Sequence, residues 1–435
     1  MLSINPFKIS RGVATGGLCI LFPGYLLYHY ALAQVWIPPF LGGLFGPVSL
    51  LIALLCILLL PWIATRSWGE AFTPGVVVST TIAYVAVWSI VNFLFIRGES
   101  YAANALTESA STVLLWIAMV FVGGFYAFDK ALSRKLLIVL GALMVLSLIH
   151  AIVRFQSPLG PYLTFSGDDP DSTQSSYQGI GRSILVTAIF LAALVNKTHH
   201  RLGLFAVGSL LLLLVGSRSD LFTLVLLTAV LALQSGLKGA NRYSTIAAMM
   251  GCVILLYFAT PLFLNTRSAE IFDLANSSSW QARQDLQTTA LGVIRNNPIF
   301  GSFEYHMRDD GAGFYAHNAL SAWTNFGLVA FILYIGLMIS FTLISFRRVR
   351  SSDGGGAVWF AAFELNLASL IQALFASPVF SPLPALAWGL TLNALRSAPR
   401  ESRGTAPDVS SSPDRTIIRV TGSTAPYIPP PQAAR

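Results

Sequence analysis

The sequence predicts an all-α polytopic membrane protein with about twelve transmembrane helices. Charged residues make up only 11% of its 435 residues and hydrophobic residues 54%, against about 25% charged residues in soluble domains. The apolar residues also gather in blocks of about 15 to 25, the length at which a helix crosses roughly 30 Å of hydrocarbon. Together these observations exclude a soluble enzyme.

Twelve apolar blocks follow one another along the chain, with polar segments between them. They cover 13–33, 41–64, 74–96, 112–128, 136–153, 180–195, 202–215, 221–233, 245–264, 319–346, 358–376 and 383–395. No small-residue cleavage site follows the first block, so we expect a retained helix and not a removed signal peptide. The blocks divide the chain into an N-terminus (1–12), nine membrane helices (13–264), a large loop (265–317), three membrane helices (318–396) and a tail (397–435).

The polar segments that join successive blocks, here called joints, should lie alternately on the two sides of the membrane. The basic residues are distributed unevenly between these two sets of joints. With the N-terminus inside, 19 of the 27 Lys and Arg residues fall on the side of both termini and 8 on the other. The positive-inside rule therefore predicts that both termini are cytoplasmic. The net charge of +8 is explained by this bias, so we expect no nucleic-acid partner.

The segment 202–233 is interrupted only by Gly216-Ser217-Arg218-Ser219-Asp220. We interpret it as two spans, because a single span would remove the charge asymmetry. Arms of about 14 residues would reach only roughly 21 Å, so the turn is expected to lie below the outer membrane surface. Arg218 would then lie at membrane depth, where ionisable groups usually have a function.

Two segments on the outer side are long, about 154–179 and 265–318. The second contains helical spacing over 279–296 and then a break at Asn297-Pro298-Ile299-Phe300-Gly301. Loops of this length tend to be functional or disordered, and we expect this one to be functional. The Ser-, Pro- and Arg-rich tail after Ser397 is expected to be disordered.

Arginines near helix ends dominate the predicted outer face. Arg182, Arg218 and Arg283 are candidates to bind a diphosphate, because a guanidinium offers a planar pair of donors to two oxygens and stays charged when partly desolvated. The alternative is structural. Arg218 could pair with Asp220, Arg283 with an acidic neighbour in the loop, and Arg182 could cap an interface.

His317 is the candidate catalytic base. It ends the large loop and precedes the next helix, which would hold an imidazole of near-neutral pKa at the membrane surface. His306, on the same loop, is the next candidate. The outer segments show no clustered carboxylates of the kind that an octahedral metal prefers, so the sequence predicts chemistry with no metal and no cofactor.

The order of these motifs resembles the O-antigen ligase and O-antigen polymerase superfamily of bacterial inner-membrane glycosyltransferases. The resemblance is carried by Gly216-Ser217-Arg218-Ser219, the run from Arg283 to Gly301, His317-Asn318 and Asn325-Phe326-Gly327-Leu328. It extends to the architecture, with one dominant loop before the tenth span and both termini inside.

The resemblance implies metal-independent glycosyl transfer on the periplasmic face of the inner membrane. The donor would be an undecaprenyl diphosphate-linked glycan, with Arg218 and Arg283 binding the diphosphate and His317 acting as base on the acceptor hydroxyl. Arg182 is added from its placement. We favour an O-antigen ligase, whose acceptor is lipid A-core, because a single dominant loop fits ligases better.

Other functions remain open at this point. An O-antigen polymerase would extend the lipid-linked glycan itself, and a protein O-oligosaccharyltransferase would glycosylate protein. A transporter or flippase is a different class with a similar number of spans. Transporters usually contain internal repeats with paired broken helices, and the two halves of this chain show no self-similarity.

Overall fold

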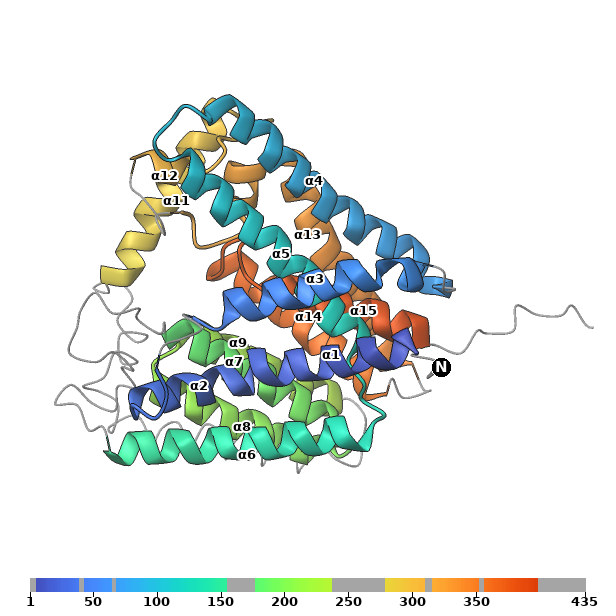
Figure 1. The fold of residues 1–435 in the computed structure, drawn as a ribbon. Coiled ribbons are helices and arrows are strands. Elements are labelled where there is room, and N and C mark those ends of the chain that lie inside the picture. Colours follow the sequence, from blue (N-terminus) through green and yellow to red (C-terminus); the bar gives the residue numbers. More distant parts are fainter. Residues whose placement is uncertain are drawn as a thin grey trace, which may run out of the picture. The chain divides into compact units, whose positions relative to one another are not determined.

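The structure is a computed structural model that describes residues 5–38, 43–64, 68–154, 177–236, 278–309, 315–351 and 356–397. All regular elements within these ranges are helices (Figure 1), which confirms the all-α prediction. Eight of these helices are long and apolar enough to cross a membrane, or nine if the bent pair α1 and α2 is one span. The chain is therefore a polytopic membrane protein. The predicted ninth span at 245–264, the first part of the large loop and the tail lie outside the described residues.

Each predicted block within the described ranges corresponds to helix. The α-helices are α1 (Pro6–Leu21), α2 (Pro23–Ala33), α3 (Phe45–Ala64), α4 (Phe72–Ile96), α5 (Ala102–Phe125), α6 (Ala131–Arg154), α7 (Tyr177–Ala193), α8 (Thr198–Val215), α9 (Arg218–Gly236), α11 (Ser278–Asn296), α12 (Tyr305–Asp309), α13 (Leu320–Arg350), α14 (Ala357–Phe375) and α15 (Leu383–Ser397). A short 3₁₀ helix, η1 (Gly69–Ala71), precedes α4.

The first predicted block, 13–33, is not one straight helix. It begins earlier, at Pro6, and bends by 44° between α1 and α2. Pro23 is the first residue of α2, and a proline has no amide hydrogen to continue the hydrogen-bond ladder of the preceding helix. The bend follows from that missing donor.

The hairpin of α8 and α9 confirms that 202–233 forms two helices. Gly216 ends α8 with φ of 74°, a left-handed conformation that glycine adopts without steric cost. The arms are longer than predicted, with 18 residues in α8 and 19 in α9, or about 27 Å each at 1.5 Å per residue. The predicted arm length is therefore wrong, and short arms do not hold the turn below the membrane surface.

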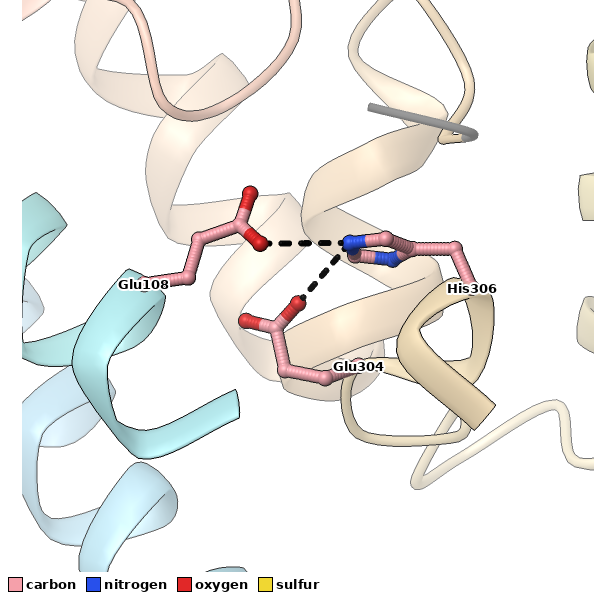
Figure 2. A group of neighbouring side chains, drawn as sticks. All are labelled: Glu108, Glu304 and His306. Atoms are coloured by element: carbon pink, nitrogen blue, oxygen red, sulfur yellow. Dashed lines mark hydrogen bonds and ion pairs between the residues drawn. The ribbon is translucent and has the colours of Figure 1, made fainter. Parts of the chain in front are cut away.

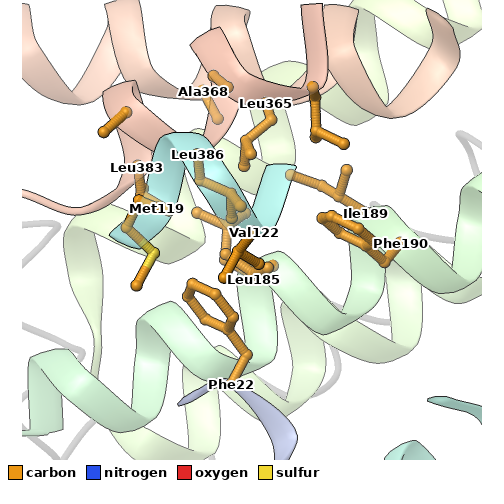
Figure 3. Close-up of a cluster of buried hydrophobic side chains, with 14 of the residues drawn as sticks. Phe22, Met119, Val122, Leu185, Ile189, Phe190, Leu365, Ala368, Leu383 and Leu386 are labelled. Atoms are coloured by element: carbon orange, nitrogen blue, oxygen red, sulfur yellow. The ribbon is translucent and has the colours of Figure 1, made fainter. Parts of the chain in front are cut away.

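The core is centred on α15, which packs against α5 and against α14. At Gly123 of α5 and Gly389 of α15 the two backbones approach so closely that a Cβ on Gly123 would lie 2.7 Å from the amide nitrogen of Leu390. Small residues permit this approach between membrane helices. The buried apolar side chains of the core include Phe22, Met119, Val122, Leu185, Ile189, Phe190, Leu365, Ala368, Leu383 and Leu386 (Figure 3).

Two glycine motifs of the sequence meet at a break in α13. Gly327 interrupts this helix with φ of 81° and ψ of 176°, and the amide of Leu328 donates to the carbonyl of Ile299 at 2.9 Å. On the other side, the amide of Ser302 donates to the carbonyl of Thr324 at 2.6 Å. The segment that follows α11 is thus fixed to the broken helix through backbone contacts, and α11 packs beside α13 (Figure 1).

Joints predicted to lie on the same side of the membrane contact one another. Arg11 pairs with Asp129 of the α5–α6 joint, and Arg348 at the end of α13 pairs with Glu70 before α4 at 2.9 Å. At the opposite end of α5, Glu108 meets His306 of the large loop. The alternation of joints agrees with the sequence prediction, while the side that faces the cytoplasm stays a prediction.

Candidate functional site

The loop before α13 is held in place from two sides. The amide of Ala319 donates to the carbonyl of Ala373 at the end of α14, at 2.6 Å. Two residues further on, the hydroxyl of Ser321 accepts the amide of Val379 at 2.8 Å. These bonds fix the position of His317, which is half-buried just before the first turn of α13.

The charge of Arg283 acts on His317, so two of the residues predicted for one site interact electrostatically. Burial, and to a smaller extent the positive charge of Arg283, together lower the pKa of His317 to about 4. Both effects disfavour the imidazolium form. At neutral pH the ring is therefore uncharged and able to accept a proton.

Arg182 lies in the N-terminal part of α7, against the turn between α8 and α9. A Cβ on the preceding residue, Gly181, would lie 2.6 Å from a carboxylate oxygen of Asp220, so α7 packs directly on this turn. The guanidinium acts electrostatically on both Asp220 and Tyr315. Its Nε is buried and has no hydrogen-bond partner among the described residues, which leaves a donor for a ligand.

Arg218 is the first residue of α9. The carboxylate of Asp220 accepts hydrogen bonds from the hydroxyl of Ser217 and from the side-chain amide of Gln372, each at 2.6 Å. The turn that carries Arg218 is thereby attached to α14, and it lies next to Arg182. The proposed roles of Arg182, Arg218 and Arg283 in diphosphate binding stay predictions, as do the structural alternatives.

Tyr315 connects the two histidines of the loop, and the sequence analysis did not identify it. Its ring centroid lies 5.2 Å from that of His306 and 5.3 Å from that of His317. Burial raises its pKa to about 12; Glu108 and Glu304 act in the same direction, and Arg182 opposes them. The phenol therefore stays protonated and can donate a hydrogen bond at the site.

Three further side chains meet next to Tyr315. Nε2 of His306 lies 3.3 Å from a carboxylate oxygen of Glu108 and 3.4 Å from one of Glu304 (Figure 2). His306 and Glu304 are fully buried. Burial and the neighbouring Glu108 raise the pKa of Glu304 well above its usual range.

This cluster corrects the expectation that the outer segments lack grouped carboxylates. Glu108 comes from α5, which begins ten residues before the predicted apolar block because 102–111 is polar yet helical. Its sequence separation from His306 is 198 residues, so no spacing motif links them. Only the contact of α5 with the large loop brings them together.

The geometry gathers a neutral imidazole and at least two guanidiniums around one loop. Arg283 acts on His317, and Arg182 acts on Tyr315, whose ring contacts that of His317. Cations of this kind can stabilise developing negative charge on a leaving group, while the imidazole accepts a proton.

Neither a search against protein-family models nor one against curated proteins finds a match for this chain.

Proposed function

We propose that the protein is an O-antigen ligase. It transfers a glycan from undecaprenyl diphosphate to a hydroxyl of lipid A-core on the periplasmic face of the bacterial inner membrane. Membrane lipids surround the helices, and both termini are cytoplasmic. The proposal rests on the motif order in the sequence and on the chemistry that the site can perform.

The observation that carries the proposal is the electrostatic effect of Arg283 on a half-buried, neutral His317. A glycosyl transfer of this type needs two things at one place, a positive charge for the departing diphosphate and a base for the attacking hydroxyl. Arg283 is on α11 and His317 lies before α13. Two groups with these complementary roles support the proposed chemistry.

The reaction balances with the residues of the chain. The acceptor hydroxyl oxygen attacks the anomeric carbon, its proton passes to His317, and the bond from that carbon to the diphosphate oxygen breaks. Undecaprenyl diphosphate leaves with the bonding electron pair, stabilised by Arg283, Arg218 and Arg182. Attack opposite the leaving group inverts the anomeric configuration.

Diphosphate bound at Arg283 would also act on His317. Its negative charge would offset the positive charge that lowers the pKa of this imidazole. The base would then become stronger when the donor is bound, which couples proton transfer to a loaded site.

The test uses purified full-length protein, a lipid-linked glycan donor and lipid A-core as acceptor. Arg283→Gln is expected to weaken donor binding and transfer, since it removes a positive charge present before the reaction. Arg295→Gln is the matched control, because Arg295 is an exposed arginine on the same helix. Equal loss in both variants, or none in Arg283→Gln, would contradict the proposal.

The same assay separates the ligase from the polymerase. With lipid A-core present, a ligase forms glycosylated core lipid. With donor alone, a polymerase forms longer lipid-linked glycans. Products only in the second reaction would reassign the function within the superfamily that the sequence resembles.

A further inference from the structure

We propose that Glu108, Glu304 and His306 form a binding site for one divalent transition-metal ion, with Zn²⁺ as the ion whose geometry fits best. The ligands are one carboxylate oxygen from each glutamate and Nε2 of the histidine. These three atoms lie within 4.8 Å of one another. The site would fasten the start of α5 to α12 and shares no residue with the arginines proposed to bind diphosphate.

The distances within the cluster match a tetrahedral ion better than a hydrogen bond. Nε2 of His306 lies 3.3 Å from Glu108 and 3.4 Å from Glu304, whereas an N–H···O bond is usually about 2.9 to 3.0 Å. Zinc bonds to nitrogen and oxygen of about 2.0 to 2.2 Å place neighbouring ligands of a tetrahedron roughly 3.3 to 3.5 Å apart. The two distances from His306 therefore already match a tetrahedral ion, and all three ligand atoms lie within 4.8 Å of one another.

A divalent ion would also balance the charges of the cluster. Glu304 and His306 are fully buried, and no hydrogen bond from the described residues reaches either carboxylate oxygen of Glu304. Buried carboxylates without such bonds are costly unless they are paired or bind a metal. Two carboxylates and a neutral imidazole around a divalent ion give a net charge of zero.

The ligand types select the ion. Imidazole and carboxylate together suit Zn²⁺ and related transition metals, whereas Mg²⁺ and Ca²⁺ prefer oxygen ligands alone. Three protein ligands leave the fourth tetrahedral position to a water molecule. The ion would be a neighbour of Tyr315, whose ring contacts both His306 and His317, so it would hold the loop that carries the proposed base.

The first experiment measures the metal directly. Full-length protein is purified in detergent, stripped with a chelator, dialysed and titrated with Co²⁺ and Zn²⁺ in the absence of any glycan donor. We expect one equivalent of Co²⁺ with the strong visible absorption of four-coordinate cobalt, displaced by Zn²⁺. Absence of this band, or only the weak absorption of six-coordinate cobalt, would overturn the proposal.

Variants assign the ion to these residues. Glu304→Gln and His306→Ala are each expected to lose this equivalent. The matched control Glu99→Gln should keep it, because Glu99 is an exposed carboxylate near the same end of α5. Binding that persists in both ligand variants would overturn the assignment.

A third variant does not depend on loss of binding. If His306 is a ligand, the Co²⁺-loaded His306→Cys variant should show an intense sulfur-to-cobalt charge-transfer band in its absorption spectrum. The control His200→Cys, at an exposed position of α8, should not show this band. A spectrum of His306→Cys without that band would count against the site even where the other variants fold poorly. The titration contains no donor or acceptor, so its result is independent of the proposed transferase activity.

Discussion

His317 shows how the surroundings of one side chain prepare it for a chemical step. Burial and the charge of Arg283 keep its imidazole neutral, and the bonds of the loop to α14 and to Val379 fix its position. A neutral histidine held in place can accept a proton without first losing one.

Replacement of this imidazole should separate binding from chemistry. His317→Ala is expected to keep its affinity for the lipid-linked donor and to lose turnover by about 100- to 10,000-fold, the usual contribution of a general base. Donor binding and single-turnover rates measure the two effects. His200→Ala serves as control at an exposed position of α8. Near-normal turnover in His317→Ala would show that His317 is not the base.

The low pKa of His317 predicts the acid limb of the pH profile. In the free enzyme the base stays neutral until the pH falls towards about 4, so kcat/KM should persist well below the pKa of about 6.5 of an exposed histidine. Arg283→Gln removes a positive charge that disfavours the imidazolium. The limb should therefore move to higher pH in this variant and stay in place in Arg295→Gln. A limb that is identical in the wild type and Arg283→Gln would show that the two groups do not interact.

At the scale of elements, the break in α13 organises the outer end of the molecule. Gly327 and Gly301 both have positive φ, and the backbone of 297–302 lies against the break. Trp88 of α4 stacks on Phe300 with ring centroids 6.0 Å apart and donates to the carbonyl of Asn325 at 3.2 Å. The large loop is in this way attached to two membrane helices.

A side chain at this break should be destabilising. In Gly327→Ala, the Cβ would lie 2.8 Å from the carbonyl oxygen of Ile299, and φ of 81° with ψ of 176° is a region that only glycine adopts readily, at a cost of about 1 to 3 kcal/mol for other residues. We expect a lower Tm in detergent and weaker donor binding.

The matched control is Gly336→Ala in the same helix, where nothing lies within 4 Å of the added Cβ. Alanine is favoured over glycine inside a helix by about 0.5 to 1 kcal/mol, so its Tm should stay equal or rise. If both variants have the same Tm, the break in α13 is not what stabilises the loop.

At the scale of the whole molecule, the joints gather at two ends. Arg11 with Asp129 and Arg348 with Glu70 belong to the end predicted to be cytoplasmic, whereas Glu108 and His306 belong to the other. Arg396 of α15 donates to the carbonyl of Gly124 at 2.7 Å and so adds a further cation to the first end.

Orientation can be tested by labelling in intact spheroplasts. A cysteine at the exposed Gln287 on α11 is expected to react with a membrane-impermeant reagent, and one at the exposed Ser351 after α13 is not. Permeabilised cells should label both. The unaltered chain, with its three natural cysteines, gives the background. The opposite pattern would reverse the predicted topology and place the proposed site on the wrong side for a periplasmic acceptor.

Part of the site could be predicted because it is local in sequence. Arginines at helix ends, a histidine directly before a helix and the helix over 279–296 are visible as residue type and spacing, and the structure brings Arg283 to His317. The bend at Pro23 was not predicted, and the lengths of α8 and α9 were underestimated. Apolar blocks mark only the part of a helix that lipid or core covers, and they give neither its polar ends nor its bends.

The sequence by itself determined that this chain is a helical membrane protein. Polar groups are costly in lipid, so membrane helices need apolar side chains in blocks of a certain length, and both features are visible in the composition and in the block lengths. It also determined the hairpin of α8 and α9, because Gly216 and the charged turn end one helix and start the next. Only the tertiary structure decided which distant groups meet. Tyr315 reaches both histidines through the fold of the large loop itself. Glu108 reaches Glu304 and His306 because α5 packs against this loop, about two hundred residues later in the chain. Such contacts depend on the packing of whole helices, which no local pattern of residues encodes.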